Sequence, residues 1–334
     1  MPREIQARGL TFSLRHAPCA HICRYCLVSE TRKGSKLPFS RFERLVHRFY
    51  DWKISNQIDI SIRTFVGPSF DYDIDTLKGV GRLRARRGGT FDILNLGGLR
   101  IRDMEALKTW MDERQAAGIV GFHTSLAGCD STHDRWNGRR GDFDYQISIL
   151  RMAGERGMVR QERLFLTQNT LPLFDRLLDI MDGIPGEIRS RIVTPFFYAG
   201  LARRYEDERI TEEIRDMLPE RIASLRRGRF QDWRTEREWI PLLMETADKP
   251  RTMAIKLDVH EGNIDQLENS SCEETFARQE RLYRDDYRRM PSFEELCVRY
   301  GDPAGNKVYI LPRDLEQKWM DMHERATGVK IPLD

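Results

Sequence analysis

A chain of 334 residues is long enough for one large α/β domain with a smaller appended segment. Charged residues make up 32% of the chain but nearly balance, leaving a net charge of +3, so nucleic acid is not an expected partner. No run reaches the roughly 18 apolar residues of a membrane span, and the first residues lack the apolar core of a signal peptide. We therefore expect a cytoplasmic protein without membrane contact.

Short β-rich runs alternate with longer helical patterns over the first two-thirds of the chain, as in parallel βα units. Six such units occupy roughly 220 residues, whereas a closed barrel of eight units takes roughly 250. The pattern predicts an α/β fold, a partial (βα)6 barrel over residues 1–226. Its predicted strands are 10–14, 58–65, 91–96, 120–126, 160–167 and 191–197, and its predicted helices are 38–53, 72–87, 103–117, 142–156, 171–181 and 211–226.

Residues 227–334 show a different, mixed pattern. We expect them to form a C-terminal α+β extension that closes one side of the barrel and covers a substrate pocket. The predicted helices are 233–245, 272–289, 291–300 and 315–325, and the predicted strands are 252–260 and 307–311.

Three of the six cysteines follow the first predicted strand with the spacing C-x3-C-x2-C, at Cys19, Cys23 and Cys26. So few cysteines, half of them bunched, do not form a disulfide framework, and a reducing compartment is expected. Three thiolates bind three corners of a four-iron cluster and leave one iron open, whereas four cysteines are the usual set. A zinc site is the alternative, with His16 or His21 as the fourth ligand.

With Tyr25 just before the last cysteine, this run resembles the signature of the radical S-adenosylmethionine (SAM) superfamily. The resemblance implies one [4Fe-4S] cluster on Cys19, Cys23 and Cys26, with SAM chelated at the open iron through its methionine. It also implies an enzyme that reductively cleaves SAM to a 5′-deoxyadenosyl radical, which abstracts a hydrogen atom from substrate. The electron would come from a donor such as flavodoxin or ferredoxin.

Two glycines end the third predicted strand, at Gly97 and Gly98. Neither has a Cβ, so the backbone can approach a ligand closely. The stretch resembles the superfamily's Gly-Gly-Glu motif, whose backbone meets the methionyl amine of SAM, although Leu99 stands where the acidic residue is expected. A plain turn between strand and helix is the alternative reading.

The fourth strand and its loop, residues 124–144, resemble the branch that contains molybdenum-cofactor and peptide-maturing enzymes. The resemblance implies that Ser125 reaches the ribose or carboxylate of SAM, and that His133 and Asp134 brace the loop. It also implies a peptide or natural-product substrate. Ala127 replaces the aspartate that this motif usually has.

The next two strand ends complete the predicted site. Asn169 follows the fifth strand, where related enzymes place a polar group against ribose or carboxylate. Phe196 ends the sixth strand and resembles the passage that flanks the adenine, although a place in the barrel core fits it equally well. Tyr25 is assigned to the same cofactor site. The resemblance spans about residues 10–225.

The remaining cysteines, Cys129, Cys272 and Cys297, form no second cluster motif. We therefore expect one cluster only, without the cysteine-rich C-terminal domain that many peptide-modifying relatives carry. A free cysteine is most often a small buried hydrophobe. In radical epimerases, a cysteine donates the hydrogen atom that quenches the substrate radical, and Cys272 and Cys297 are the candidates for that role. A non-enzymatic iron–sulfur or zinc-binding protein is the remaining alternative.

Overall fold

The computed structural model describes residues 5–28, 34–226, 232–245 and 251–329. Within them, parallel strands form a three-stranded sheet in the order β2-β1-β8 and a four-stranded sheet in the order β3-β4-β5-β6. A short antiparallel pair joins β7 and β9. The strands are β1 (Ile5–Arg15), β2 (Ser61–Gly67), β3 (Ile93–Asn95), β4 (Gly121–Leu126), β5 (Val159–Phe165), β6 (Ile188–Thr194), β7 (Arg234–Thr235), β8 (Arg251–Val259) and β9 (Val308–Tyr309).

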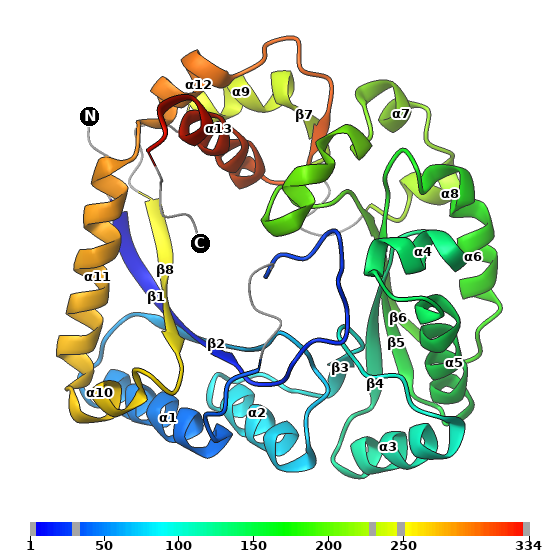
Figure 1. Cartoon of the computed structure of the whole chain (residues 1–334), viewed down its shortest axis with the longest axis horizontal. Coiled ribbons are helices and arrows are strands. Elements are labelled where there is room, and N and C mark those ends of the chain that lie inside the picture. Colours follow the sequence, from blue (N-terminus) through cyan, green and yellow to red (C-terminus); the bar gives the residue numbers. More distant parts are fainter. Residues whose placement is uncertain (1–4, 29–33, 227–231, 246–250, 330–334) are drawn as a thin grey trace.

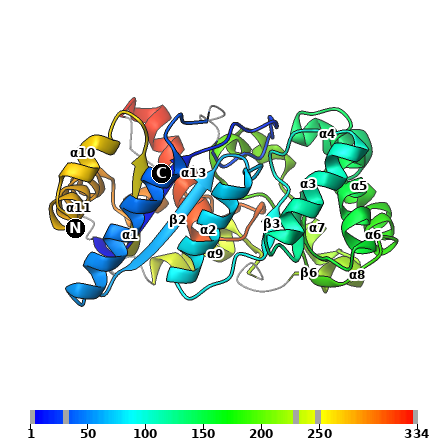
Figure 2. The same ribbon diagram turned by 90° about the horizontal axis from the view of Figure 1, so that it is seen from below.

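Helices lie outside the two sheets, which face a common central space (Figure 1). In the view from below, α10 and α11 lie at one end of the molecule and α5 and α6 at the other (Figure 2). None of the described helices has the length and apolarity needed to cross a membrane. The helices are α1 (Phe39–Ser55), α2 (Ile74–Arg86), α3 (Met104–Ala116), α4 (Asp130–Asn137), α5 (Asp142–Glu155), α6 (Phe174–Asp182), α7 (Glu212–Asp216), α8 (Glu220–Ala223), α9 (Glu236–Met244), α10 (Ile264–Asn269), α11 (Cys272–Arg289), α12 (Phe293–Tyr300) and α13 (Pro312–Thr327).

Strand β1 separates an apolar face from a polar one. Leu10, Phe12 and Leu14 are fully buried, and the Phe12 ring meets that of Phe49 in α1 edge-on at 4.9 Å. Because successive side chains of a strand point to opposite faces, Thr11 faces away from this helical layer. The central space is therefore lined by the polar positions of the strand.

The mixed α/β fold with parallel sheets is confirmed. The partial barrel is not confirmed, because β2 does not pair with β3 in the described residues and the six predicted strands lie in two separate sheets. The predicted helix 211–226 is wrong: it consists of α7 and α8, because Pro219 cannot continue a helix. Strand β8, from the predicted extension, pairs in parallel with β1 inside the main sheet.

A buried ion network fixes the outer face of the four-stranded sheet. Glu162 on β5 accepts from Arg160 Nε at 2.5 Å and from the neighbouring Arg191 of β6. Arg160 also donates to the carbonyl oxygens of Met181 in the last turn of α6 and of Ile184 and Pro185 after it, which holds that helix on the sheet.

Replacing Glu162 with alanine is expected to lower the free energy of unfolding by about 3–5 kcal/mol, because both arginines lose a buried counter-charge. Urea unfolding followed by circular dichroism measures this change. The exposed Glu105, which pairs with Lys108, is the control, and Glu105→Ala should change stability by less than about 0.5 kcal/mol. Equal effects of the two substitutions would contradict the role of the network.

Candidate functional site

The three clustered cysteines lie on the segment that follows β1, residues 16–28, here called the cysteine loop. Figure 1 shows it in dark blue near the middle of the molecule. Other strand ends hold its backbone: the Ala20 N–H donates to the Gly98 carbonyl at 3.2 Å, and the Arg24 N–H donates to the Trp136 carbonyl at 2.8 Å. The Leu201 N–H, in the segment after β6, donates to the Cys26 carbonyl at 2.9 Å. The loop is thus clamped between segments that follow β3, β4 and β6.

Glycines make this close approach possible at two points. Gly98 has a φ of 78°, and a Cβ there would lie 2.8 Å from Cys19 Sγ and 3.1 Å from Ser69. Gly200 has a φ of 54°, and a Cβ there would lie 2.1 Å from the Cys26 carbonyl oxygen. Both positions require glycine, for backbone conformation and for space. The loop therefore rests directly on backbone at both ends.

The three thiols interact with one another. Burial and the neighbouring Cys19 and Cys26 raise the pKa of the Cys23 thiol. No three His, Cys, Asp or Glu side chains in the described parts of the chain are arranged as a ready metal site. Thiols are soft donors suited to zinc and to iron–sulfur clusters, so the donor set itself fits a metal.

The two histidines proposed as a fourth zinc ligand each have one ring nitrogen in another contact. His16 Nε2 lies 3.0 Å from Thr76 Oγ1. His21 Nδ1 accepts from the Gly98 N–H at 3.3 Å, and its Nε2 faces Asp142 Oδ1 at 3.2 Å. His21 therefore belongs to the scaffold of the loop in this structure.

An aromatic cluster packs against the second half of the cysteine loop. Tyr25 stacks on Phe196, with ring centroids 5.0 Å apart and planes inclined by 14°. Phe165 lies 4.6 Å and Trp136 4.7 Å from Phe196. The Tyr25 hydroxyl donates to Asn137. Tyr25 and Phe196, predicted from separate motifs, are thus brought together. The role of Phe196 beside adenine and that of Tyr25 in cofactor binding stay predictions.

Asp142, the first residue of α5, has a fully buried carboxylate next to the cysteine loop. His133 Nε2 lies 3.1 Å from its Oδ2, and His21 Nε2 lies 3.2 Å from its Oδ1. Each ring accepts a backbone N–H at Nδ1, from Ala127 at 3.2 Å and from Gly98 at 3.3 Å. Because an Nδ1 that accepts a hydrogen bond carries no proton, this pattern assigns the proton of both rings to Nε2, which lies within ion-pair distance of the carboxylate in each case.

Further donors complete the set around Asp142. Gln146 Nε2 donates at 2.9 Å, Arg139 Nε at 3.1 Å, and the Asn137 amide donates as well. Burial opposes ionisation of Asp142, but the hydrogen bonds from His133 and His21 outweigh it and hold its pKa well below the usual range. The charge also lies in the first turn of α5, where the helix dipole favours it.

The bracing role predicted for His133 and Asp134 is confirmed. His133 joins Ala127 to Asp142, as described above. The Asp134 carboxylate accepts the N–H groups of Gly141 and Phe143, the latter at 2.9 Å, at the start of α5. The loop after β4 is therefore an ordered connection that contains helix α4.

Ser125, Asn169 and Gly97 lie at strand ends, and the contacts found for Asn169 and Gly97 are with residues outside the cysteine loop. Ser125 is half-buried on β4, and the exposed Asn169 donates to Glu208. The Gly97 N–H donates to Asn95 Oδ1 at 2.6 Å, which fixes the turn after β3. Their assignment to SAM stays a prediction.

The remaining cysteines lie elsewhere. Cys272 begins α11 and is buried in the main core, where Arg48 of α1 interacts with it. Cys297 is buried in a second core cluster formed by α9, α12 and α13. Cys129, at the start of α4, is also buried. None of the three lines the cavity of about 840 Å³ that borders β1, β2 and β8. The hydrogen-donor role of Cys272 and Cys297 gains no support from their positions and stays untested.

Asp142 and Asn137 were not singled out from the sequence as functional residues, and His21 was considered only as a zinc ligand. Two signals point to them in retrospect. His21 is the polar residue between the first two cysteines, and Asp142 follows the Gly141 that begins α5. Neither signal identifies the partner, because the contact joins segments about 120 residues apart in the chain.

No protein-family model and no curated protein match this chain. Several solved structures resemble it weakly. SuiB from Streptococcus suis bound to S-adenosylmethionine gives a TM-score of 0.40 and 12% identity over 77% of this chain and 52% of SuiB. SuiB bound to its precursor peptide SuiA gives 0.39 and 15%, over 57% of this chain and 40% of SuiB. This chain thus spans about half the length of SuiB or less.

A third structure, histidine-tagged anSMEcpe with bound AdoMet, gives a TM-score of 0.44 and 12% identity over 97% of this chain and 99% of anSMEcpe. Likeness at this level carries no conclusion about the activity of the present chain. The functional argument therefore rests on the residues of the site.

Replacing Gly98 with alanine should displace Cys19. The left-handed conformation costs an alanine about 1–2 kcal/mol, and the new Cβ would also contact the thiol. Gly88 has a φ of 76° and open space around its missing Cβ, so Gly88→Ala carries the same strain without the contact. Alkylation of Cys19 in metal-free protein, followed by mass spectrometry, should accelerate in Gly98→Ala and not in Gly88→Ala. The same rate in both variants would refute this packing.

Replacing Asp142 with asparagine should loosen the whole cysteine loop. The variant removes the charge that His21, His133 and Arg139 share, and we expect a loss of about 3 kcal/mol or more of stability. Hydrogen exchange should rise over residues 16–26 and at the start of α5. Asp144, exposed two residues further along α5, is the control, and Asp144→Asn should leave exchange in the loop unchanged. Unchanged exchange in Asp142→Asn would show that the carboxylate does not hold the loop.

Proposed function

We propose that this chain is a radical SAM enzyme that carries one [4Fe-4S] cluster on Cys19, Cys23 and Cys26. The observation that carries the proposal is the cysteine loop itself. Its three thiols follow the first strand of a parallel sheet, and the backbone of the β3 end packs directly against the first of them. Functional groups of parallel α/β proteins gather at this edge, beyond the carboxyl ends of the strands.

The residues of the loop fit a cluster with one open iron better than a zinc ion. Structural zinc takes four protein ligands. In the described structure, His21 is held by Gly98 and Asp142, and the other cysteines lie elsewhere. Three thiols without a fourth protein donor match a four-iron cluster that leaves one position for SAM.

When bound, a cluster of this type supplies one electron to the sulfonium of SAM, which gives methionine and a 5′-deoxyadenosyl radical that takes a hydrogen atom from substrate. The residues of the chain itself bind and orient SAM. Gly97 and Gly98 offer backbone to the methionyl amine, while Ser125 and Asn169 offer hydrogen bonds to the ribose or carboxylate. Tyr25 and Phe196 offer an apolar wall for the adenine.

A peptide or natural product is the proposed substrate, and a small electron carrier such as flavodoxin or ferredoxin the proposed reductant, in the cytoplasm. Epimerisation with a cysteine as hydrogen donor is a narrower version of the same proposal. No position in the structure favours it, because Cys272 and Cys297 are buried in helical packing.

Anaerobic reconstitution should give about four irons and four sulfides per chain, and dithionite with SAM should give 5′-deoxyadenosine and methionine. The variant with Cys19, Cys23 and Cys26 replaced by alanine should lose both. The matched control replaces Cys129, Cys272 and Cys297 and should keep both.

Two results would overturn the proposal. One is stoichiometric zinc in protein purified without oxygen. The other is a protein loaded with four irons that forms no deoxyadenosine.

A further inference from the structure

A polar cavity of about 840 Å³ lies along β1, β2 and β8, and α11 and α13 complete its walls. Figure 1 shows β1, β8 and α11 on the side of the molecule opposite to β4, β5 and β6. The cavity includes none of the residues assigned above to the cluster or to SAM. Its ligand is therefore a separate question.

Two cations and a hydroxyl form one row on the strands of this cavity. Thr11 of β1 is in register with Arg63 of β2 and with Lys256 of β8, and all three line the cavity. Adjacent strands lie about 4.8 Å apart, so the row spans roughly 10 Å at the Cα atoms. This is the polar face of β1, opposite the face that packs against α1.

Four charged residues of the cavity wall have partners, whereas Arg63 and Asp286 have none among the described residues. Lys256 pairs with Asp258 at 3.3 Å, and Arg313 and Glu316 of α13 make further contacts. Arg63 makes no hydrogen bond or ion pair within the described parts of the chain. A guanidinium facing a polar cavity is a bidentate site for a carboxylate or phosphate.

The other walls favour a peptide carboxylate over a phosphate. Asp258, Asp286 and Glu316 also face the cavity, and they would repel a dianion more than a single carboxylate. Gln317 is 4% exposed and lines the cavity, and its Nε2 has no hydrogen-bond acceptor, although Asp321 lies near it on the same helix. An amide nitrogen carries two N–H groups, so one of them suits a peptide carbonyl even when Asp321 accepts the other.

The row formed by Thr11, Arg63 and Lys256 lies at a defined distance, measured along the strands, from the cysteine loop; this distance is called its depth. Thr11 is four residues before Arg15, where β1 ends and the loop begins, and Arg63 is four residues before Gly67, the end of β2. At about 3.3 Å per residue, the depth is roughly 13 Å. An extended peptide anchored at Arg63 would reach the strand ends with about three or four residues.

We propose that this cavity binds a peptide through a carboxylate seated on Arg63 beside Thr11, three or four residues away from the reacting position. The identification of this peptide as the substrate rests on the proposed function, whereas its binding does not. The carboxylate belongs to an acidic side chain or to the C-terminus of the peptide, and the two sources are separable by experiment.

The test uses reconstituted protein with SAM and three tetrapeptide probes under anaerobic conditions. The probes are a capped peptide with one glutamate, its glutamine analogue, and an all-alanine peptide with a free C-terminus. Titration by ligand-observed NMR should show that at least one carboxylate probe binds about tenfold more tightly than the glutamine peptide. The probe that is preferred identifies the source of the carboxylate.

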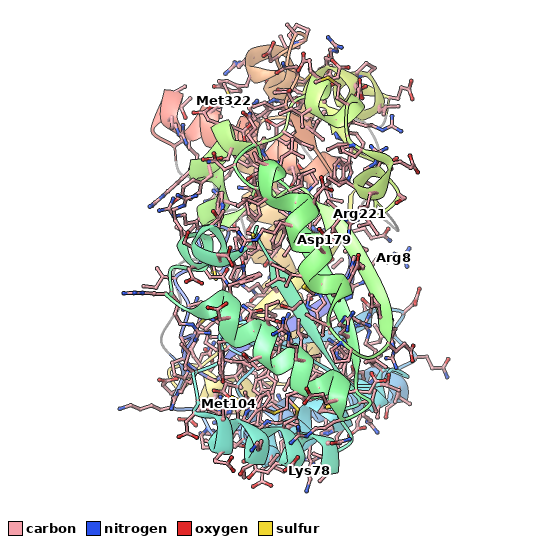
Figure 3. All side chains as sticks on the ribbon, turned by 90° about the vertical axis from the view of Figure 1, so that its right-hand side faces the viewer. Arg8, Lys78, Met104, Asp179, Arg221 and Met322 are labelled. Atoms are coloured by element: carbon pink, nitrogen blue, oxygen red, sulfur yellow. The ribbon has the colours of Figure 1, made fainter. Side chains whose placement is uncertain are left out.

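Arg63→Ala and Arg63→Gln should reduce this preference to less than about twofold. Arg8 is the control: it lies at the edge of the molecule in Figure 3, pairs with Asp59 and does not line the cavity, so Arg8→Ala should keep the full preference. Thermal unfolding of each variant, followed by circular dichroism, checks that its fold is intact.

The inference fails if wild-type protein binds the three probes equally or not at all, or if both Arg63 variants keep the preference. Deoxyadenosine formation, measured in the same samples, separates this failure from failure of the proposed function. SAM cleavage without carboxylate preference overturns the cavity assignment alone. Preference without SAM cleavage leaves a peptide-binding site in a protein that is not a radical SAM enzyme.

Discussion

The buried carboxylate of Asp142 is the interaction on which the site depends. An ionised group away from water costs several kcal/mol unless its oxygens are fully paired. Its partners come from the cysteine loop through His21, from α4 through His133 and from α5 through Gln146. If any one of these segments moved alone, the buried carboxylate of Asp142 would lose one of its partners. The loop position is therefore set by the protein scaffold itself, with the thiols carried on it.

The two faces of the strands have different roles in the molecule. On β1, alternate positions bury Leu10 and Phe12 under the helices and leave Thr11 to the central space. The same alternation on β2 and β8 places Arg63 and Lys256 beside Thr11. A polar cavity next to the cysteine loop thus follows from a period of two along three neighbouring strands. The outer faces of the strands pack against helices and stabilise the fold, whereas the inner faces border the polar cavity.

Local patterns were sufficient to predict the strands, most helices and the cysteine loop, because each depends on residues close in sequence. Long-range pairings were not predictable in this way. Strand β8 joins β1 across more than 200 residues, and a charged residue such as Arg63 within a strand looks like a solvent-facing position. Leu99 was noted as a departure from an acidic motif. Its side chain is buried in the core and its carbonyl accepts from Arg139, so the turn uses this position for packing.

The two glycines after β3 are not equivalent, although the sequence treats them as one motif. A side chain at Gly97 would meet the Asn95 amide at 2.9 Å, whereas one at Gly98 would meet the Cys19 thiol and the Ser69 backbone. A change at Gly98 therefore acts first on the position of Cys19 in the cysteine loop. A change at Gly97 acts on the turn after β3 and does not contact a thiol. Substitutions at the two glycines therefore separate the packing of the cysteine loop from the proposed approach of the backbone to SAM.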